Sequence, residues 1–143
     1  MPTKVTEYMS AKVISAKKDV GLREAFFLMR EKKIRHLPIV DESGLLVGIV
    51  SDRELRRPNW VDEAPDIAHV YNLSDDLCVA DIMNKNVFCL HTYDTLSKAV
   101  KMLLEQRIGA APILDKTGAL VGMLSAVDLL HALNDLLDMQ KNN

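Results

Sequence analysis

The chain has 143 residues, a length that suits one ordinary domain or two very small ones. A formal net charge of −2 disfavours broad binding to the phosphate backbone of nucleic acids, and 48% hydrophobic with 27% charged residues is typical of a soluble globular protein. The apolar runs are too short to span a membrane, and the N-terminal residues lack the apolar stretch of a secretory signal. The two cysteines form no Cys-x-x-Cys pair, so we expect a reduced, cytoplasmic protein.

The sequence contains an internal duplication. Val5–Leu55 (the first copy) aligns without a gap on Val79–Leu129 (the second copy), an offset of 74 residues. Most of the positions that recur are apolar, Gly or Pro, the residue types that form cores and turns. Each copy has only about fifty residues and buries too little surface to form a stable core alone, so we expect the copies to share a core. We expect them to pack about a pseudo-two-fold axis, with a ligand cleft between them.

The first copy predicts a β-α-β-β-α order. The expected elements are a strand at 13–15, a helix at 21–33, strands at 37–40 and 45–50, and a helix from Ser51. The helix at 21–33 is indicated by apolar residues at i, i+3, i+4 and i+7. Between the two later strands, Gly44 is expected to supply a positive φ in a turn. The unbroken apolar run at 45–50 predicts a strand that is buried on both faces.

The second copy repeats this order after a linker. The sequence predicts a first repeat at 1–57, a linker with a short helix at 58–76, and a second repeat at 77–139. In the second copy, either Asp94 or Thr95 is the expected N-cap of the first helix.

The last helix has a wider apolar face than a final surface helix needs. Its apolar residues are Val127, Leu129, Leu130, Leu133, Leu136 and Leu137. This width favours a contact between two copies of the chain, and burial within the chain is the alternative interpretation.

A strand followed by Ser and then a helix occurs once in each copy. Ser51 is followed three residues later by Glu54, and Ser125 by Asp128. Both pairs fit a capping box, in which the side chains close two free N–H groups at a helix start. The same geometry also fits a ligand site, because a helix N-terminus attracts phosphate and a nearby carboxylate accepts hydrogen bonds from a ribose diol.

A family resemblance supports the ligand interpretation. The run Arg35-His36-Leu37-Pro38-Ile39-Val40-Asp41, then Gly44 and Gly48-Ile49-Val50-Ser51, together with their counterparts, resembles the CBS domain. Two in tandem resemble a CBS pair, or Bateman module, which implies an α/β (α+β) fold. The resemblance extends from about Val5 to Leu137, and the size and linker are similar to those of stand-alone bacterial CBS-pair proteins, including the acetoin-utilisation type.

The resemblance implies a sensor rather than an enzyme. CBS pairs bind adenosine-containing ligands such as AMP, ADP, ATP, S-adenosylmethionine or NAD, and no further cofactor is required. Ser125 and Asp128 match the family positions that line the site and bind the ribose. Ser51 also matches, but Glu54 replaces Asp, so a weaker second site is expected there. The residues that the resemblance places around the base are Met83, Val87, Ile108, Ala110 and Pro112.

The two copies differ where the resemblance places the phosphates. The first copy offers Arg35, His36 and Arg53, whereas the second offers Gly109, Ala110 and Val127 at the aligned positions. Because Arg pairs well with phosphate, we expect one good nucleotide site, with base and ribose on the second copy and phosphate on the first. The alternatives are ordinary surface charge for the two arginines and a hydrogen-bonded strand residue for His36.

No spacing of His or Cys predicts a metal site, and no nucleophile with a base is indicated. Two functions therefore stay open. One is an adenine-nucleotide-sensing homodimer that regulates an unknown protein, and the other is a ligand-independent dimerisation scaffold. The sequence does not specify which adenosine ligand binds, how many phosphates it has, or which protein is regulated. It also does not specify whether the dimer is parallel or antiparallel, or whether the Glu54 site is occupied.

Overall fold

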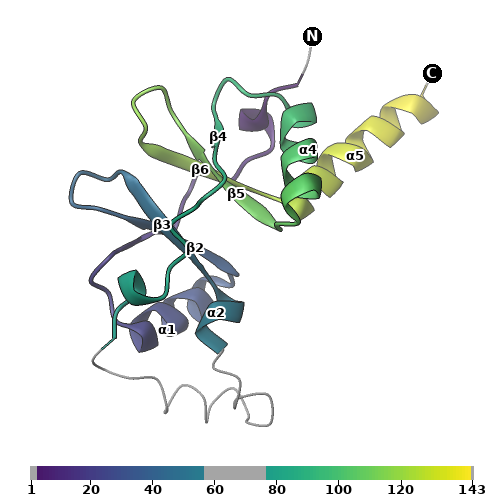
Figure 1. Cartoon of the computed structure of the whole chain (residues 1–143). Coiled ribbons are helices and arrows are strands. Elements are labelled where there is room, and N and C mark those ends of the chain that lie inside the picture. Colours follow the sequence, from purple (N-terminus) through teal and green to yellow (C-terminus); the bar gives the residue numbers. More distant parts are fainter. Residues whose placement is uncertain (1–2, 57–76, 143) are drawn as a thin grey trace. The chain divides into compact units, whose positions relative to one another are not determined.

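The computed structural model describes residues 3–56 and 77–142, and these residues fold into two compact units (Figure 1). The middle unit comprises Ile14–Val87, and the terminal unit combines Met1–Val13 with Phe88–Asn143. The short helix that the sequence predicts within the linker at 58–76 lies outside the described residues.

The middle unit has a three-stranded sheet with helices beside it. Its elements are β1 (Ala16–Lys17), α1 (Leu22–Lys32), β2 (His36–Val40), β3 (Leu46–Ser51), α2 (Asp52–Arg56) and a 3-10 turn, η3 (Val79–Asp81). β2 is the central strand, with β1 parallel to it and β3 antiparallel to it. The predicted β-α-β-β-α order is confirmed. The first strand, expected at 13–15, lies instead at Ala16–Lys17, where it pairs with Ile39 and Val40.

The terminal unit repeats the same arrangement. Its elements are η1 (Val5–Glu7), β4 (Leu90–His91), α4 (Leu96–Gln106), β5 (Ala110–Leu114), β6 (Leu120–Ser125) and α5 (Ala126–Lys141). β5 is central, with β4 parallel and β6 antiparallel to it. The two units therefore share one topology, as the duplication predicts.

The first long helix of each unit follows the predicted apolar pattern. In α1 the buried residues are Leu22, Ala25, Phe26 and Met29, which form one face against the sheet. In α4 the N-cap is Thr95, the second of the two predicted candidates, and its side chain accepts a hydrogen bond from the Lys98 N–H at 3.2 Å.

The prediction that the strand at 45–50 is buried on both faces is wrong. Only Gly48 and Val50 of β3 are buried, and Leu45, two positions before Val47 and just outside the strand, is exposed. The reason is that β3 is an edge strand in a sheet of three, so its apolar run does not indicate a central position. The predicted turn before it is confirmed, because Gly44 has a φ of +84°.

The opening segment of each copy packs with the body of the other copy. Val5 is fully buried in the core of the terminal unit, where its N–H donates to the Asp94 carbonyl at 2.9 Å. Val79 occupies the equivalent place in the core of the middle unit, where its N–H donates to the Val20 carbonyl at 2.8 Å. The compact units therefore differ from the sequence copies. About the first ten residues of each copy belong to the compact unit that holds the rest of the other copy.

Candidate ligand site

The junction between β6 and α5 holds the two residues that best match a ribose site (Figure 1). Ser125 is the N-cap of α5 and has an extended backbone, with φ −108° and ψ 166°. Its Oγ accepts from the Asp128 N–H at 3.2 Å, and its own N–H donates to Oδ2 of Asp128 at 2.8 Å. This is a complete capping box, so the predicted cap is confirmed.

The capping box leaves Asp128 able to bind more. A carboxylate has two oxygens that together accept several hydrogen bonds, and the cap uses Oδ2 for one of them. The side chains of Ser125 and Asp128 are both half-buried rather than enclosed. The cap holds the carboxylate in a fixed position at the positive end of a helix of 16 residues, a favourable place for a ribose or an anion.

Three of the predicted base-binding residues lie in the same unit as this junction. Ala110 pairs with Ser125 across β5 and β6, and Pro112 pairs with Met123. Ile108 lies two residues before β5 and packs against the core. Strand pairing therefore brings Ala110 beside the α5 cap, as the prediction requires.

The other two predicted base-binding residues, Met83 and Val87, belong to the middle unit. Met83 packs over Gly48, where a Cβ would overlap the Met83 sulfur. In the terminal unit the same position is filled by Met9, which packs over Gly122. The methionine that packs over β6 within its own unit is thus Met9, which the repeat alignment places in the first copy.

The junction between β3 and α2 is the counterpart in the middle unit. Ser51 is half-buried at the end of β3, and the Asp52 N–H donates to the Arg35 carbonyl at 2.9 Å. The Ala126 N–H makes the equivalent bond, also of 2.9 Å, to the Gly109 carbonyl. The side chain of Glu54 lies outside the described residues, so its role stays a prediction.

Arg35 lines a pocket of about 290 Å³ in the middle unit. Phe26, Met29 and Leu55 are buried side chains at this pocket. The full lining is Phe26, Met29, Arg30, Lys33, Ile34, Arg35, Asp52 and Leu55. The pocket therefore combines apolar side chains with three cationic groups and one carboxylate.

Two of these cations were not predicted as site residues. Arg30 and Lys33 belong to the C-terminal end of α1, where basic residues are commonly explained by the helix dipole. The second copy has Leu104 and Arg107 at the aligned positions. The signal that could have identified Arg30 is this replacement of a cation by leucine between otherwise similar copies.

His36 and Arg53 lie close to Arg35 in the chain but are placed differently. Arg53 is exposed on α2, and His36 is half-buried at the start of β2, opposite Ser51 in the sheet. Burial lowers the pKa of His36, Asp52 opposes this effect and the Arg35 charge adds to it. His36 therefore favours its neutral form, which still donates or accepts one hydrogen bond at each ring nitrogen.

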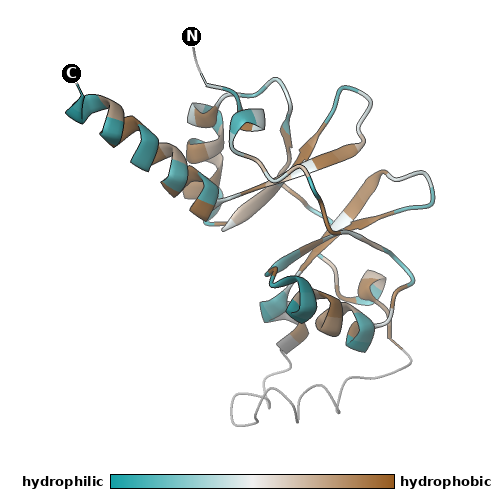
Figure 2. Cartoon of the chain, turned by 180° about the vertical axis from the view of Figure 1, so that it is seen from behind, coloured by the Kyte–Doolittle hydropathy of each residue, from teal (hydrophilic) through white to brown (hydrophobic). Residues whose placement is uncertain are grey.

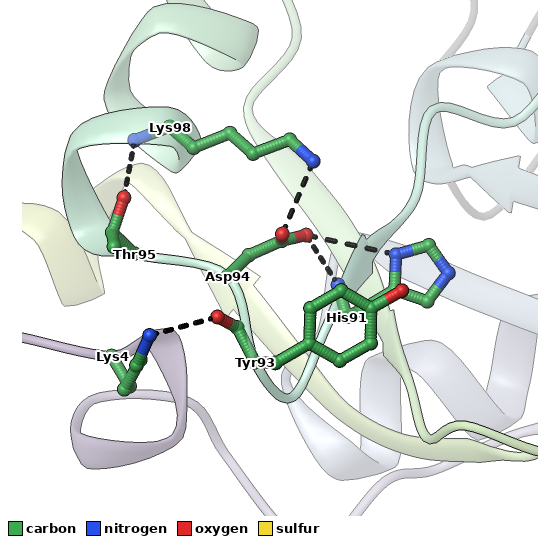
Figure 3. A network of polar contacts seen from close by, with 6 residues as sticks. All are labelled: Lys4, His91, Tyr93, Asp94, Thr95 and Lys98. Carbon is green, nitrogen blue, oxygen red and sulfur yellow. Dashed lines mark hydrogen bonds and ion pairs between the residues drawn. The ribbon is translucent and has the colours of Figure 1, made fainter.

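A separate polar cluster surrounds Asp94, the buried charged residue of the described chain (Figure 3). Its carboxylate accepts from the His91 N–H at 2.8 Å and from Lys98 Nζ at 3.1 Å. Burial by itself raises the pKa of Asp94, but the hydrogen bonds from His91 and Lys98 outweigh it and lower the pKa. The bonds of its carboxylate join the end of β4 to the first turn of α4, so we assign the cluster a structural role.

Among residues 3–56 and 77–142, no group of three or more His, Cys, Asp or Glu side chains is placed to hold a metal ion. No helix within those same ranges has the length and apolar character needed to cross a membrane. Cys78 and Cys89 form no disulfide bond.

Two units of one topology, each with a Ser at a strand–helix junction, define the chain as a tandem-repeat α/β protein. The model of the CBS domain family matches residues 5–58 and again residues 79–135. The chain therefore belongs to the CBS domain family, and it contains a tandem CBS pair.

Known relatives agree with this assignment. The chain is 30% identical over 142 residues to a CBS domain-containing protein of Dictyostelium discoideum, with 96% of each chain covered. It is also 29% identical over 133 residues to a homoserine O-acetyltransferase of Methanohalobium evestigatum, but it spans only 24% of that enzyme's length.

Two solved structures are similar over nearly their whole length. A Vibrio cholerae protein assigned to the acetoin utilization type (AcuB) has a TM-score of 0.78 and 26% identity, with 100% of this chain and 98% of that chain covered. CBSX2 from Arabidopsis thaliana, solved in complex with AMP, has a TM-score of 0.77 and 26% identity, with 94% and 98% covered.

Proposed function

We propose that this chain is a regulatory module that binds an adenosine-containing ligand of the AMP, ADP or ATP class. The observation that carries the proposal is the β6–α5 junction, where a capping box fixes Asp128 beside Ser125 and Ala110. The AMP complex of CBSX2, a similar CBS pair, supports an adenosine ligand. S-adenosylmethionine and NAD contain the same adenosine group and belong in the same screen.

The proposed roles follow from the chemistry of each group. Asp128 accepts hydrogen bonds from the ribose hydroxyls, and Ser125 lines the site beside it. The base lies among Ile108, Ala110 and Pro112, with Met83 and Val87 as the further contacts that the family resemblance implies. Met9, which packs beside β6, is an added candidate for the base contact.

For the phosphates we propose the basic residues Arg35, His36 and Arg53 of the first copy. This part rests on the contrast between the two copies, because the second copy has no cation at the aligned positions. Arg30 and Lys33 line a pocket together with Arg35 and strengthen the positive field there. A second, weaker site at Ser51 and Glu54 stays part of the proposal.

The proposed mechanism is a population shift. A ligand that binds one arrangement of the CBS pair better than others stabilises that arrangement, and a regulated protein responds to it. We propose that the protein works as a homodimer in the cytoplasm. The proposed mechanism has no catalytic step.

The test is isothermal titration calorimetry with AMP, ADP and ATP on the wild type and on Asp128→Asn. This change keeps a side-chain acceptor for the Ser125 N–H but removes the negative charge. Losing a hydrogen bond to a charged group costs about 1.5–3 kcal/mol, so affinity should fall roughly ten- to a hundredfold. Asp138→Asn, on the same helix, is the matched control and should bind like the wild type.

The competing function is a ligand-independent dimerisation scaffold. The observation that favours it is the capping box itself, since Ser125 and Asp128 already satisfy each other's backbone groups. A thermal-shift screen separates the two functions. A ligand at about a hundred times its Kd adds roughly 2.7 kcal/mol, which raises the melting temperature by several degrees. No shift with AMP, ADP, ATP, S-adenosylmethionine or NADH would support the scaffold.

A further inference from the structure

The pocket that Arg35 lines is formed within one unit. All of its lining residues lie within Ile14–Val87, and they come from α1, from the turn that precedes β2, and from α2. The two helices contact each other (Figure 1), and hydrophobic and hydrophilic residues are mixed along both of them (Figure 2). The middle unit therefore brings apolar and charged side chains together at this pocket.

The buried part of the lining, the apolar floor, consists of Phe26, Met29 and Leu55. These side chains are 2%, 3% and 1% exposed and belong to the core of the middle unit. A volume of about 290 Å³ is near the lower limit of about 300 Å³ for ligand pockets. At the roughly 30 Å³ that one water occupies in the liquid, the pocket has room for about ten non-hydrogen atoms. It therefore suits a molecule smaller than a nucleotide.

The rim of the pocket is mainly cationic. Arg30, Lys33 and Arg35 are exposed, and Asp52 is a half-buried carboxylate beside them. The Arg30 guanidinium lies over the Phe26 ring, 5.9 Å from its centroid, and this contact favours a position at the edge of the apolar floor. In the described part of the chain, neither Lys33 nor Arg35 forms an ion pair, so both charges are available to a ligand.

The turn after α1 orders the backbone below this rim. Lys33 has a left-handed conformation, with a φ of +57°, and its N–H donates to the Arg30 carbonyl at 3.3 Å. The Ile34 N–H donates to the Met29 carbonyl at 3.0 Å. These two bonds form a Schellman motif, which ends the helix in a defined geometry. Arg30 and Lys33 therefore project from a hydrogen-bonded turn, which reduces the cost of ordering them around a ligand.

The two sequence copies differ at the rim but agree at the floor. Arg30, Arg35 and Asp52 align with Leu104, Gly109 and Ala126. The floor residues Phe26, Met29 and Leu55 align with Val100, Leu103 and Leu129. The terminal unit reaches the same topology without three of the four charged groups, so the fold does not require them. This contrast favours a binding role for the rim.

We propose that this pocket binds a small carboxylic acid with an apolar body, such as an arylacetate. The carboxylate pairs with Arg30 and Lys33, and the hydrocarbon body covers the apolar floor. Asp52 favours a singly charged carboxylate, because it repels a doubly charged phosphate more strongly. The site is separate from the proposed nucleotide site: it rests on Arg30, Lys33 and the floor, and it requires no nucleotide.

The test is a titration of the isotope-labelled full chain with phenylacetate, without nucleotide, followed by two-dimensional amide NMR. The amide signals of Arg30, Ile34 and Asp52 should shift until they saturate. Phenylacetamide, which has the same shape but no charge, and acetate, which has the charge but no apolar body, should shift them only weakly at the same concentration. Equal shifts with phenylacetamide, or no saturable shift with phenylacetate, would overturn the proposal.

A substitution at the rim tests the role of the charge. Arg30→Leu should lower the affinity for phenylacetate roughly ten- to a hundredfold, because a hydrogen bond to a charged group is lost. Lys32→Leu is the matched control: it removes a charge from the same end of α1 at an exposed residue outside the pocket lining, and it should bind like the wild type. The amide spectra show that each variant is folded, and an equal loss of affinity in both variants contradicts the site.

The outcomes separate this site from the proposed nucleotide site. Because the phenylacetate titration contains no nucleotide, AMP binding without phenylacetate binding contradicts the pocket proposal alone. Phenylacetate binding without AMP binding contradicts the nucleotide proposal alone.

Discussion

At the scale of single residues, Asp94 and His36 show how the two copies have diverged in polarity. Asp94 is only 7% exposed, and it is stabilised by Lys98 and by the His91 N–H. The first copy has Val20 at the aligned position, so a half-buried apolar side chain in one unit corresponds to a buried, hydrogen-bonded carboxylate in the other. Because these bonds lower the pKa of Asp94, its contribution to stability persists in mild acid and is lost as the pH falls through its folded-state pKa.

His36 predicts a dependence of stability on pH nearer to neutrality. Its pKa is lowered by burial, so the unfolded chain takes up a proton at about pH 6.5, before the folded chain does. The free energy of unfolding should therefore fall as the pH drops from 7.5 through 6.5 towards the folded-state pKa.

The measurement is the urea midpoint at pH 7.5 and pH 5.5. The variant His36→Gln, which has no titrating ring, should lose most of the difference between the two pH values. His131→Gln, an exposed residue of α5, is the control and should keep the wild-type difference. A wild-type midpoint that does not change between these pH values would contradict the prediction.

At the scale of elements, the local pattern predicted most of the helices and strands. The helix positions follow from apolar periodicity. The turn before β3 was predicted from Gly44, and this residue has the expected positive φ. The burial of β3 was not predictable, because an apolar run of six residues does not reveal whether a strand is central or at an edge. Ala110 lies one residue before the strand that the repeat alignment predicts, at 111–114, but in the structure it pairs with Ser125 and brings part of the candidate site together.

The start of α5 allows a test at this scale. Ser125→Ala removes the Oγ that accepts from the Asp128 N–H, and loss of such a cap costs about 1 kcal/mol. Chemical denaturation should show this loss, and Ser125→Thr, which keeps the hydroxyl, should recover most of it. Ser97→Ala, on the exposed surface of α4, is the control and should leave stability nearly unchanged. Equal stability of Ser125→Ala and the wild type would mean that the cap does not stabilise α5.

At the scale of the whole molecule, the exchange of opening segments was not predictable from the sequence. The repeat comparison aligns Val5 with Val79 but does not say which body each segment packs against. That choice depends on long-range bonds such as the one from the Val5 N–H to the Asp94 carbonyl, which no local pattern encodes. For the same reason, the sequence grouped Met83 with the second copy, whereas the structure packs it over Gly48 in the middle unit.

The exchange predicts how the chain divides into folding fragments. A fragment of residues 14–87 contains Val79 and should fold cooperatively, because it holds the whole core of the middle unit. A fragment of residues 1–57 lacks Val79 and should unfold, although it ends at the boundary of the first sequence repeat. Thermal unfolding followed by circular dichroism distinguishes them, and a cooperative transition in 1–57 but not in 14–87 would refute the assignment.

The exchanged segments also restrict how such a chain could have arisen by duplication. A protein with a single repeat has no second body for its opening segment, so it completes its core only by lending that segment to another molecule and receiving one in return. An ancestral single repeat would then have been an obligate pair that exchanged its opening segments. Joining two such repeats end to end would turn that contact between molecules into an intramolecular one with a high effective concentration. It would also let the two halves differ from each other, as they do where Leu104 of the second copy aligns with Arg30 of the first.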